Sequence, residues 1–216
     1  MGGKAVRRQG GNLLPVVHVV TNDDIAHRPD LGARARAVAQ AGAIGLHARA
    51  PRLEGRALLD LARTLQNAVA GTHSLLLIND RVDIARVVKA QGVHLPAEGL
   101  PVAEARRLLG PGVLVGRSTH SPEEARQAHA EGADYVFLGP IWETASHPGT
   151  RPLGPDAIAQ CAPARVIAIG GITPQRAALC REAGAYGVAV ISAVWNAPDP
   201  GGVVGEILLS FGQVGG

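Results

Sequence analysis

A histidine stands between an apolar run and the start of a predicted helix, at His120 in Gly-Arg-Ser-Thr-His-Ser-Pro-Glu-Glu. Ser121 can accept hydrogen bonds from free backbone N–H groups, and Pro122 suits the first helical position, so His120 falls on a short loop. An imidazole has an unperturbed pKa of about 6.5 and can both take up and return a proton near neutral pH. His120 is therefore a candidate acid/base group; the alternative is that it only hydrogen-bonds its own loop.

A second stretch has the composition of a phosphate site. Gly170 and Gly171 follow an apolar run and precede a helix start at Thr173, and Ile191 and Ser192 end the next apolar run. Glycines let backbone N–H groups approach phosphate oxygens closely, and a helix N-terminus favours an anion. We expect these glycines, Ile191 and Ser192 to bind a phosphate; the alternative is a tight turn whose glycines serve packing.

Short aliphatic runs alternate with helical patterns along the whole chain. Strands are predicted at 16–21, 43–49, 74–79, 92–95, 114–117, 135–139, 166–170 and 187–191, and helices near 31–41, 53–70, 80–89, 102–109, 122–131, 155–160, 173–183 and 202–211. This α/β alternation predicts a single-domain (β/α)8 TIM barrel over 15–212, after a flexible N-terminal lead-in at 1–14. A doubly wound open sheet is the alternative, but the first predicted strand lacks the glycine-rich loop that such a sheet would need.

In a TIM barrel the C-terminal ends of the strands meet at one mouth, which is where active sites form. Several polar side chains follow predicted strands and should gather there. They are His47, Arg49, Asn79, Asp80, His94, Ser118, His120 and Thr144. For Asn79 and Asp80 a helix-capping role is an alternative, and we expect His94 to be structural.

Composition excludes several other classes of protein. The 216 residues are 46% hydrophobic but only 3% aromatic, which indicates an aliphatic core. A scattered net charge of +3 does not indicate a nucleic-acid partner, and no apolar run approaches the roughly 18 residues of a membrane span. Cys161 and Cys180 have no metal-site spacing, so we expect a reduced, cytoplasmic chain. The N-terminus lacks an apolar segment followed by a cleavage site, so we expect no signal peptide.

Five motifs occur in the same order as in a known family. Together they resemble the thiamine phosphate synthase superfamily over about residues 16 to 195. The motifs are Ile-Asn-Asp-Arg-Val-Asp from Ile78, Gly-Val-His-Leu from Gly92, Gly-Arg-Ser-Thr-His-Ser from Gly116, Ala-Asp-Tyr-Val-Phe-Leu-Gly-Pro-Ile from Ala133 and Ala-Ile-Gly-Gly-Ile from Ala168. The resemblance implies a thiazole phosphate substrate and a homodimer.

One branch of that superfamily, the synthase, joins a pyrimidine pyrophosphate to a thiazole phosphate with Mg²⁺. The resemblance implies that Asp80 helps to hold the metal. This chain departs from the synthase pattern at three places. Pro51 stands at a lysine position, Gly99 beside Glu98 stands at a metal-binding aspartate, and Thr-Ala-Ser-His from Thr144 replaces a Thr-x-Thr-Lys run.

The other branch, the thiazole tautomerase, aromatises a thiazole phosphate carboxylate by moving a proton and needs no metal. Its pattern resembles this chain around His120, which implies that His120 is the acid/base residue. Arg49 would pair with the substrate carboxylate, and His47, Asn79, Ser118 and Thr144 would contact the substrate.

The first hypothesis is therefore a thiazole tautomerase, an isomerase without a cofactor. Two alternatives remain open: a Mg²⁺-dependent synthase, a transferase, with an altered pyrophosphate site, and a regulatory protein that binds thiazole phosphate without catalysis. The roles of His47, His94 and Glu98 also stay open.

Overall fold

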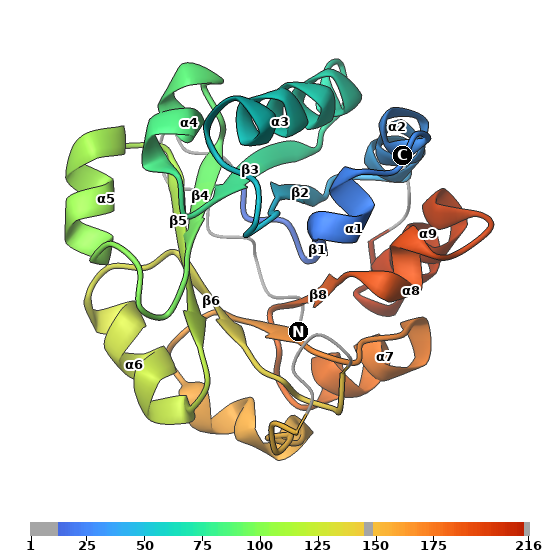
Figure 1. Cartoon of the computed structure of the whole chain (residues 1–216). Coiled ribbons are helices and arrows are strands. Elements are labelled where there is room, and N and C mark those ends of the chain that lie inside the picture. The colour runs from blue at the N-terminus through green and yellow to red at the C-terminus, as the bar shows by residue number, and fades with distance from the viewer. Residues whose placement is uncertain (1–12, 145–148, 214–216) are drawn as a thin grey trace.

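Eight parallel strands close into one barrel in chain order, which confirms the predicted TIM barrel (Figure 1). The computed structural model describes residues 13–144 and 149–213. The strands are β1 Val17–Val20, β2 Gly45–Ala48, β3 Leu75–Asn79, β4 Gly92–Leu95, β5 Leu114–Thr119, β6 Tyr135–Leu138, β7 Val166–Ile169 and β8 Gly187–Val190. Each predicted strand contains or overlaps its observed counterpart, because parallel strands covered on both faces are continuous apolar runs.

Helices cover the outside of the barrel (Figure 1). Seven of the described helices correspond to predicted ones: α2 Leu31–Gln40, α3 Gly55–Val69, α4 Val82–Val87, α5 Val102–Leu109, α6 Pro122–Ala130, α7 Pro174–Glu182 and α9 Pro200–Ser210. Two short helices were not predicted, α1 Asp23–Ala26 and α8 Ser192–Trp195. The α-helix predicted at 155–160 is wrong: the segment forms two 3-10 turns, Pro155–Ala157 and Ala159–Cys161. The segment is short, and Pro163 disfavours helical backbone at Ala162, which stops a helix from continuing beyond Cys161.

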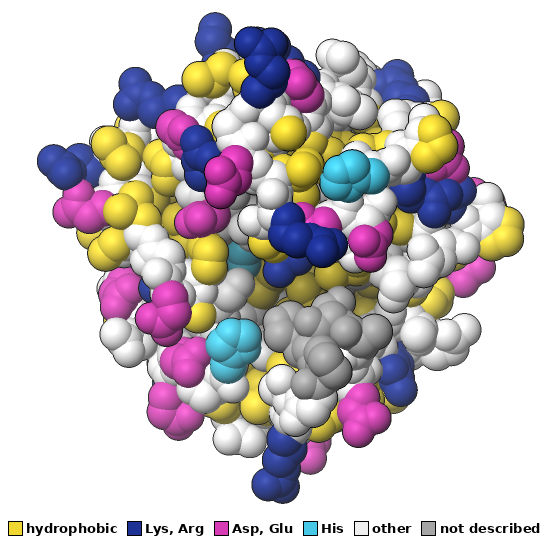
Figure 2. All heavy atoms as spheres, viewed as in Figure 1, with side chains coloured by type: hydrophobic (Ala, Val, Ile, Leu, Met, Phe, Trp, Pro, Cys, Tyr) yellow, Lys and Arg dark blue, Asp and Glu magenta, His cyan; other side chains and the backbone are white. Residues whose placement is uncertain are grey.

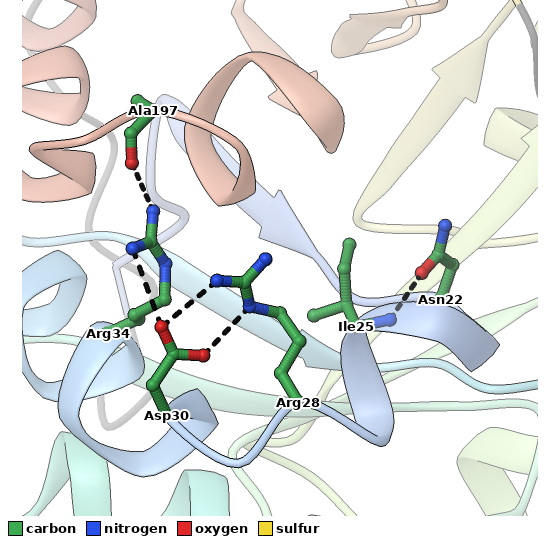
Figure 3. Close-up of polar contacts among 6 residues, drawn as sticks. All are labelled: Asn22, Ile25, Arg28, Asp30, Arg34 and Ala197. Carbon is green, nitrogen blue, oxygen red and sulfur yellow. Dashed lines mark hydrogen bonds and ion pairs between the residues drawn. The ribbon is translucent and has the colours of Figure 1, made fainter.

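Side-chain caps fix where several helices begin. Ser121 accepts a hydrogen bond from the Glu124 backbone N–H at the start of α6, as the sequence predicts, and Thr173 accepts one from the Arg176 backbone N–H at the start of α7. Asn22 caps α1 in the same way through the backbone N–H of Ile25, at 2.9 Å (Figure 3). Such caps satisfy N–H groups that a helix leaves without partners, and they fix the loops that follow the strands.

A cluster of charged side chains ties the segment after α1 to the segment after α8 (Figure 3). The Arg28 Nε–H donates to the Asp30 carboxylate at 2.9 Å, and Arg34 forms an ion pair with the same carboxylate at 3.7 Å. Arg34 also donates to the carbonyl oxygen of Ala197. The loops after the first and last strands are thereby held together.

The barrel core begins before the first strand. Leu14 is buried at 6% exposure, and its carbonyl oxygen accepts a hydrogen bond from the Tyr186 hydroxyl at 3.0 Å. Leu14 therefore belongs to the packed barrel rather than to the lead-in predicted at 1–14, whose residues 1–12 lie outside the described part of the chain. None of the described helices is long and apolar enough to span a membrane.

Candidate active site

A cavity of about 730 Å³ opens at the C-terminal ends of the strands, and we call it the mouth pocket. Every site residue predicted from the sequence lines it, including Asp80, which was expected only for a synthase. These residues are His47, Arg49, Asn79, Asp80, Ser118, His120, Thr144, Gly170, Gly171, Ile191 and Ser192. His94 lines the pocket as well, whereas Glu98 is not among the lining residues. Figure 2 shows a hollowed centre on the viewed face, with basic side chains beside it.

His120 is held by both its backbone and its ring. Its backbone N–H donates to the Glu124 carboxylate at 2.7 Å, and its Nδ1 lies 2.8 Å from the carbonyl oxygen of Gly139. A carbonyl oxygen can only accept, so Nδ1 carries a proton and Nε2 is the ring position that gains or loses one. This geometry gives His120 a defined tautomer for acid/base chemistry.

Arg49 brings a positive charge to the pocket. Its backbone is fixed by Thr21, whose hydroxyl donates to the Arg49 carbonyl at 2.8 Å and accepts from its N–H at 2.9 Å. Burial lowers the pKa of Arg49, a shift that Asp23 opposes, but an arginine stays charged in proteins. No hydrogen bond joins the Arg49 guanidinium to another residue in the described ranges, so it is free to bind an anion.

Asp80 enters the pocket through an unusual backbone conformation. Its φ is 65°, in the left-handed region that Asp tolerates better than most residues. Its N–H donates to the His94 carbonyl at 2.8 Å, which ties the end of β3 to the end of β4. The N-terminal cap of α4 is Arg81, so a helix-capping role for Asn79 or Asp80 is wrong.

The pocket offers few ligands to a metal ion. Asp80 and Glu54 are its carboxylates, and within the described residues no group of three His, Cys, Asp or Glu side chains is arranged to hold a metal. Mg²⁺ is often bound by one or two carboxylates together with substrate phosphates. One or two carboxylates of this kind fit a magnesium ion whose other ligands are phosphate oxygens of a substrate.

The predicted phosphate end depends on its two glycines. Gly170 and Gly171 have φ of 98° and 66°, and a Cβ on either would lie under 3 Å from the backbone of Pro140 or Glu143. Close packing and positive φ are enough to explain why both positions are glycine. Both residues also line the pocket, where their backbone can contact a ligand. Sequence reasoning missed Arg176, which donates to the Gly171 carbonyl at 2.7 Å and lies 5.0 Å from the Trp142 ring.

Histidines form the floor of the pocket. His94 Nε2 lies 2.9 Å from the Ser118 hydroxyl and His94 Nδ1 lies 3.3 Å from the Tyr135 hydroxyl. His47 Nε2 lies 2.7 Å from Nδ1 of His18, a residue that sequence reasoning did not place in the site. Its signal was strand alternation: His18 lies between Val17 and Val19 in β1, so its side chain takes the opposite face, toward the lumen.

Comparisons with known proteins agree on one family. The family described as "Thiamine monophosphate synthase" matches residues 17–194. The chain is 47% identical over 176 residues to the "Thiamine biosynthesis bifunctional protein ThiM/ThiE" of Symbiobacterium thermophilum, covering 80% of this chain but only 37% of that protein. It is 43% identical over 190 residues to the "Thiamine-phosphate synthase" of Chlorobium luteolum, covering 86% of this chain and 88% of the relative.

A solved structure supports the same assignment. The thiamine phosphate pyrophosphorylase from Pyrococcus furiosus superposes with a TM-score of 0.76 at 28% identity, covering 90% of this chain and 95% of that one. The Chlorobium luteolum relative is named a synthase, and neither sequence relative is named a tautomerase. The chain belongs to the thiamine monophosphate synthase family.

Proposed function

We propose that this chain is a thiamine-phosphate synthase, which couples a pyrimidine pyrophosphate to a thiazole phosphate in the mouth pocket. The 43% identity to the Chlorobium luteolum synthase, over 86% of this chain and 88% of the relative, supports the synthase better than the tautomerase. In the structure, one observation carries the proposal: the same pocket contains the free Arg49 guanidinium, Asp80, and the turn at Gly170 and Gly171. A pocket with these groups suits two anionic ligands.

In this reaction a C–N bond forms to the thiazole ring while the C–O bond to pyrophosphate breaks. Negative charge therefore accumulates on the leaving pyrophosphate. Arg49 places a fixed positive charge in the pocket for it, and a preorganised charge of this kind stabilises a transition state. Asp80 would hold Mg²⁺, which neutralises the leaving pyrophosphate when it is bound. The Gly170–Gly171 turn and Ser192 would hold the thiazole phosphate, and Asn79 and Ser118 would donate hydrogen bonds.

The departures from the synthase pattern concern the leaving group. Pro51 lines the pocket where the pattern has a lysine, and Gly99, at the second metal carboxylate, is not among the lining residues. His147, at the position of the other lysine, lies outside the described residues. Fewer groups then stabilise the pyrophosphate, so we expect this chain to couple its substrates more slowly than a synthase with the full pattern.

The thiazole tautomerase is the second candidate, and the geometry of His120 favours it. The hydrogen bond to Gly139 fixes the proton on Nδ1 and leaves Nε2 to remove a proton from the thiazole and return it at another ring atom. Arg49 would pair with the substrate carboxylate. This reaction uses the residues that the chain retains and none of those that it lacks.

One experiment separates the candidates. The purified protein is given pyrimidine pyrophosphate and thiazole phosphate with and without Mg²⁺, and thiamine phosphate is measured by chromatography; aromatisation of the thiazole phosphate carboxylate is measured in parallel without metal. Mg²⁺-dependent thiamine phosphate supports the synthase. Aromatisation without coupling supports the tautomerase and overturns the synthase. Binding of thiazole phosphate without either reaction would leave the non-catalytic binding protein.

A further inference from the structure

Three histidines lie in the lumen of the barrel, and their ring nitrogens are not equally satisfied. His18, His47 and His94 are 0%, 1% and 2% exposed. Both nitrogens of His18 have partners, His47 and the carbonyl oxygen of Pro15, and both nitrogens of His94 have partners, Ser118 and Tyr135. Among residues 13–144 and 149–213, His47 has a single hydrogen-bond partner, His18, which its Nε2 contacts.

The hydrogen bonds of His18 and His47 fix which nitrogen of each ring carries the proton. The Pro15 carbonyl can only accept, so His18 Nε2, at 3.1 Å, carries a proton. A neutral imidazole has one N–H, so His18 Nδ1 is bare and must accept from His47 Nε2 at 2.7 Å. His47 Nε2 then carries the proton of that ring, and His47 Nδ1 is left as a bare acceptor.

Both rings stay neutral because they are buried. Desolvation lowers the pKa of His18 to about 3, against a smaller opposing effect of its bond to Pro15. Desolvation likewise lowers the pKa of His47, and the neighbouring His18 and His94 lower it further. Neither ring gains a second proton near neutral pH, so the proton order just derived holds.

The bare nitrogen of His47 faces accessible space. Within the described residues, the buried side-chain nitrogen or oxygen atom that lacks a partner is Arg34 Nε. His47 Nδ1 also lacks a partner, but unlike Arg34 Nε it is not fully enclosed by protein atoms. Because His47 lines the mouth pocket, its Nδ1 can be reached from that pocket. An acceptor at the floor of a binding pocket without a donor of its own calls for one from the ligand.

The ring of His18 is held in place by its surroundings. It lies 5.0 Å from the Tyr135 ring and 5.6 Å from the Phe137 ring, centroid to centroid. Gly45 makes room for it, since a Cβ there would lie 2.9 Å from His18 Nδ1. The His18 ring cannot turn over without losing its hydrogen bond to Pro15. His18 therefore keeps its proton on Nε2 and holds the proton of His47 on Nε2 of that ring.

We infer that His47 recognises an uncharged N–H or O–H donor of a ligand at the pocket floor, and that His18 is a positioning residue that sets the tautomer of His47. The inference deepens the proposed function, on which it rests for the heterocyclic nature of the ligand. It gives a role to His18, which is not among the residues that line the pocket, and it states which chemical group of a ligand His47 binds.

The first test is nitrogen NMR of the ¹⁵N-histidine-labelled protein without ligand. We expect His47 in the Nε2–H tautomer with a bare Nδ1, and a proton on Nδ1 of His47 would overturn the inference. In His18→Leu the ring should populate both tautomers. Should that variant fail to fold, the wild-type spectrum alone still decides the tautomer.

The second test measures donor selectivity by titrating the protein with 4-aminopyrimidine and with 4-methylpyrimidine, a pair of similar size of which only the first has an exocyclic N–H. A hydrogen bond of ordinary net strength predicts a preference of roughly three- to tenfold for the amine. His47→Gln keeps a carbonyl acceptor and should keep the preference, whereas His47→Leu should lose it. Equal affinities in the wild type, or a preference that survives in His47→Leu, would overturn the inference. Neither test needs turnover, so a protein that passes both but couples and aromatises nothing refutes the proposed function alone.

Discussion

Acidification from pH 7 to pH 5 should destabilise this barrel through its buried histidines. The pKa of His18 is about 3 in the folded chain, against 6.5 for an unperturbed histidine. Because the folded pKa is depressed, the unfolded chain binds the proton first, so stability is present above about pH 6.5 and is lost as the pH falls toward 3. One pKa unit corresponds to about 1.36 kcal/mol, so the 1.5 units between 6.5 and 5 remove about 2 kcal/mol through His18. His47 and His94 act in the same direction.

Urea denaturation followed by circular dichroism at pH 7, 6 and 5 measures this loss. At roughly 2 kcal/mol per molar urea, the midpoint should fall by about 1 M through His18 alone. The matched controls are His73→Gln, an exposed histidine that should leave the pH dependence unchanged, and His18→Gln, which should be less stable at pH 7 but show a shallower pH dependence. A midpoint that stays constant from pH 7 to pH 5 in the wild type would refute the assignment of neutral, buried imidazoles.

Three further predictions concern the site and the lumen. His120→Asn keeps a donor for the Gly139 carbonyl, so we expect an unchanged urea midpoint but, for the tautomerase reaction, a loss of roughly 10²- to 10⁴-fold in kcat; an unaffected rate would remove His120 from acid/base chemistry. Arg49→Gln should weaken phosphate-ester binding in calorimetry by roughly tenfold or more, since charged hydrogen bonds contribute about 1.5–3 kcal/mol, and equal affinity would contradict the anion role. Gly116→Ala would place a Cβ 2.1 Å from the Tyr135 ring and should lower the free energy of unfolding, measured in urea, by about 1–3 kcal/mol. Gly205→Ala, in open space within α9, should raise it by up to about 1 kcal/mol.

The sequence was enough to predict the barrel because its signals are local. Each strand contains a short apolar stretch, and each predicted cap is set by one side chain and the N–H groups next to it in the chain. The helix predicted at 155–160 was wrong because the segment has only six residues and Pro163 stops a helix from continuing beyond Cys161. The membership of the mouth pocket could also be predicted, since the topology of a barrel brings all strand ends to one side.

The hydrogen bonds of the site could not be predicted, because they join residues that are far apart in the chain. His18 and His47 are 29 residues apart and meet only when β1 and β2 pair. Arg176 was missed for a similar reason, since its position over the Trp142 ring depends on how the loop after β6 meets the first turn of α7. His94 was expected to be structural; it does bond Tyr135 and Ser118, but it also lines the pocket.

The central claim is that the mouth pocket converts a thiazole phosphate, and a coupling assay tests it most directly. Pyrimidine pyrophosphate, thiazole phosphate and Mg²⁺ are incubated with the wild type and with Arg49→Gln, and thiamine phosphate is measured over time. We predict thiamine phosphate in the wild type, dependent on Mg²⁺, and a much slower reaction in the variant. A wild type that makes no thiamine phosphate would contradict the synthase. A wild type that also leaves the thiazole phosphate carboxylate unchanged in the parallel assay without metal would contradict the claim.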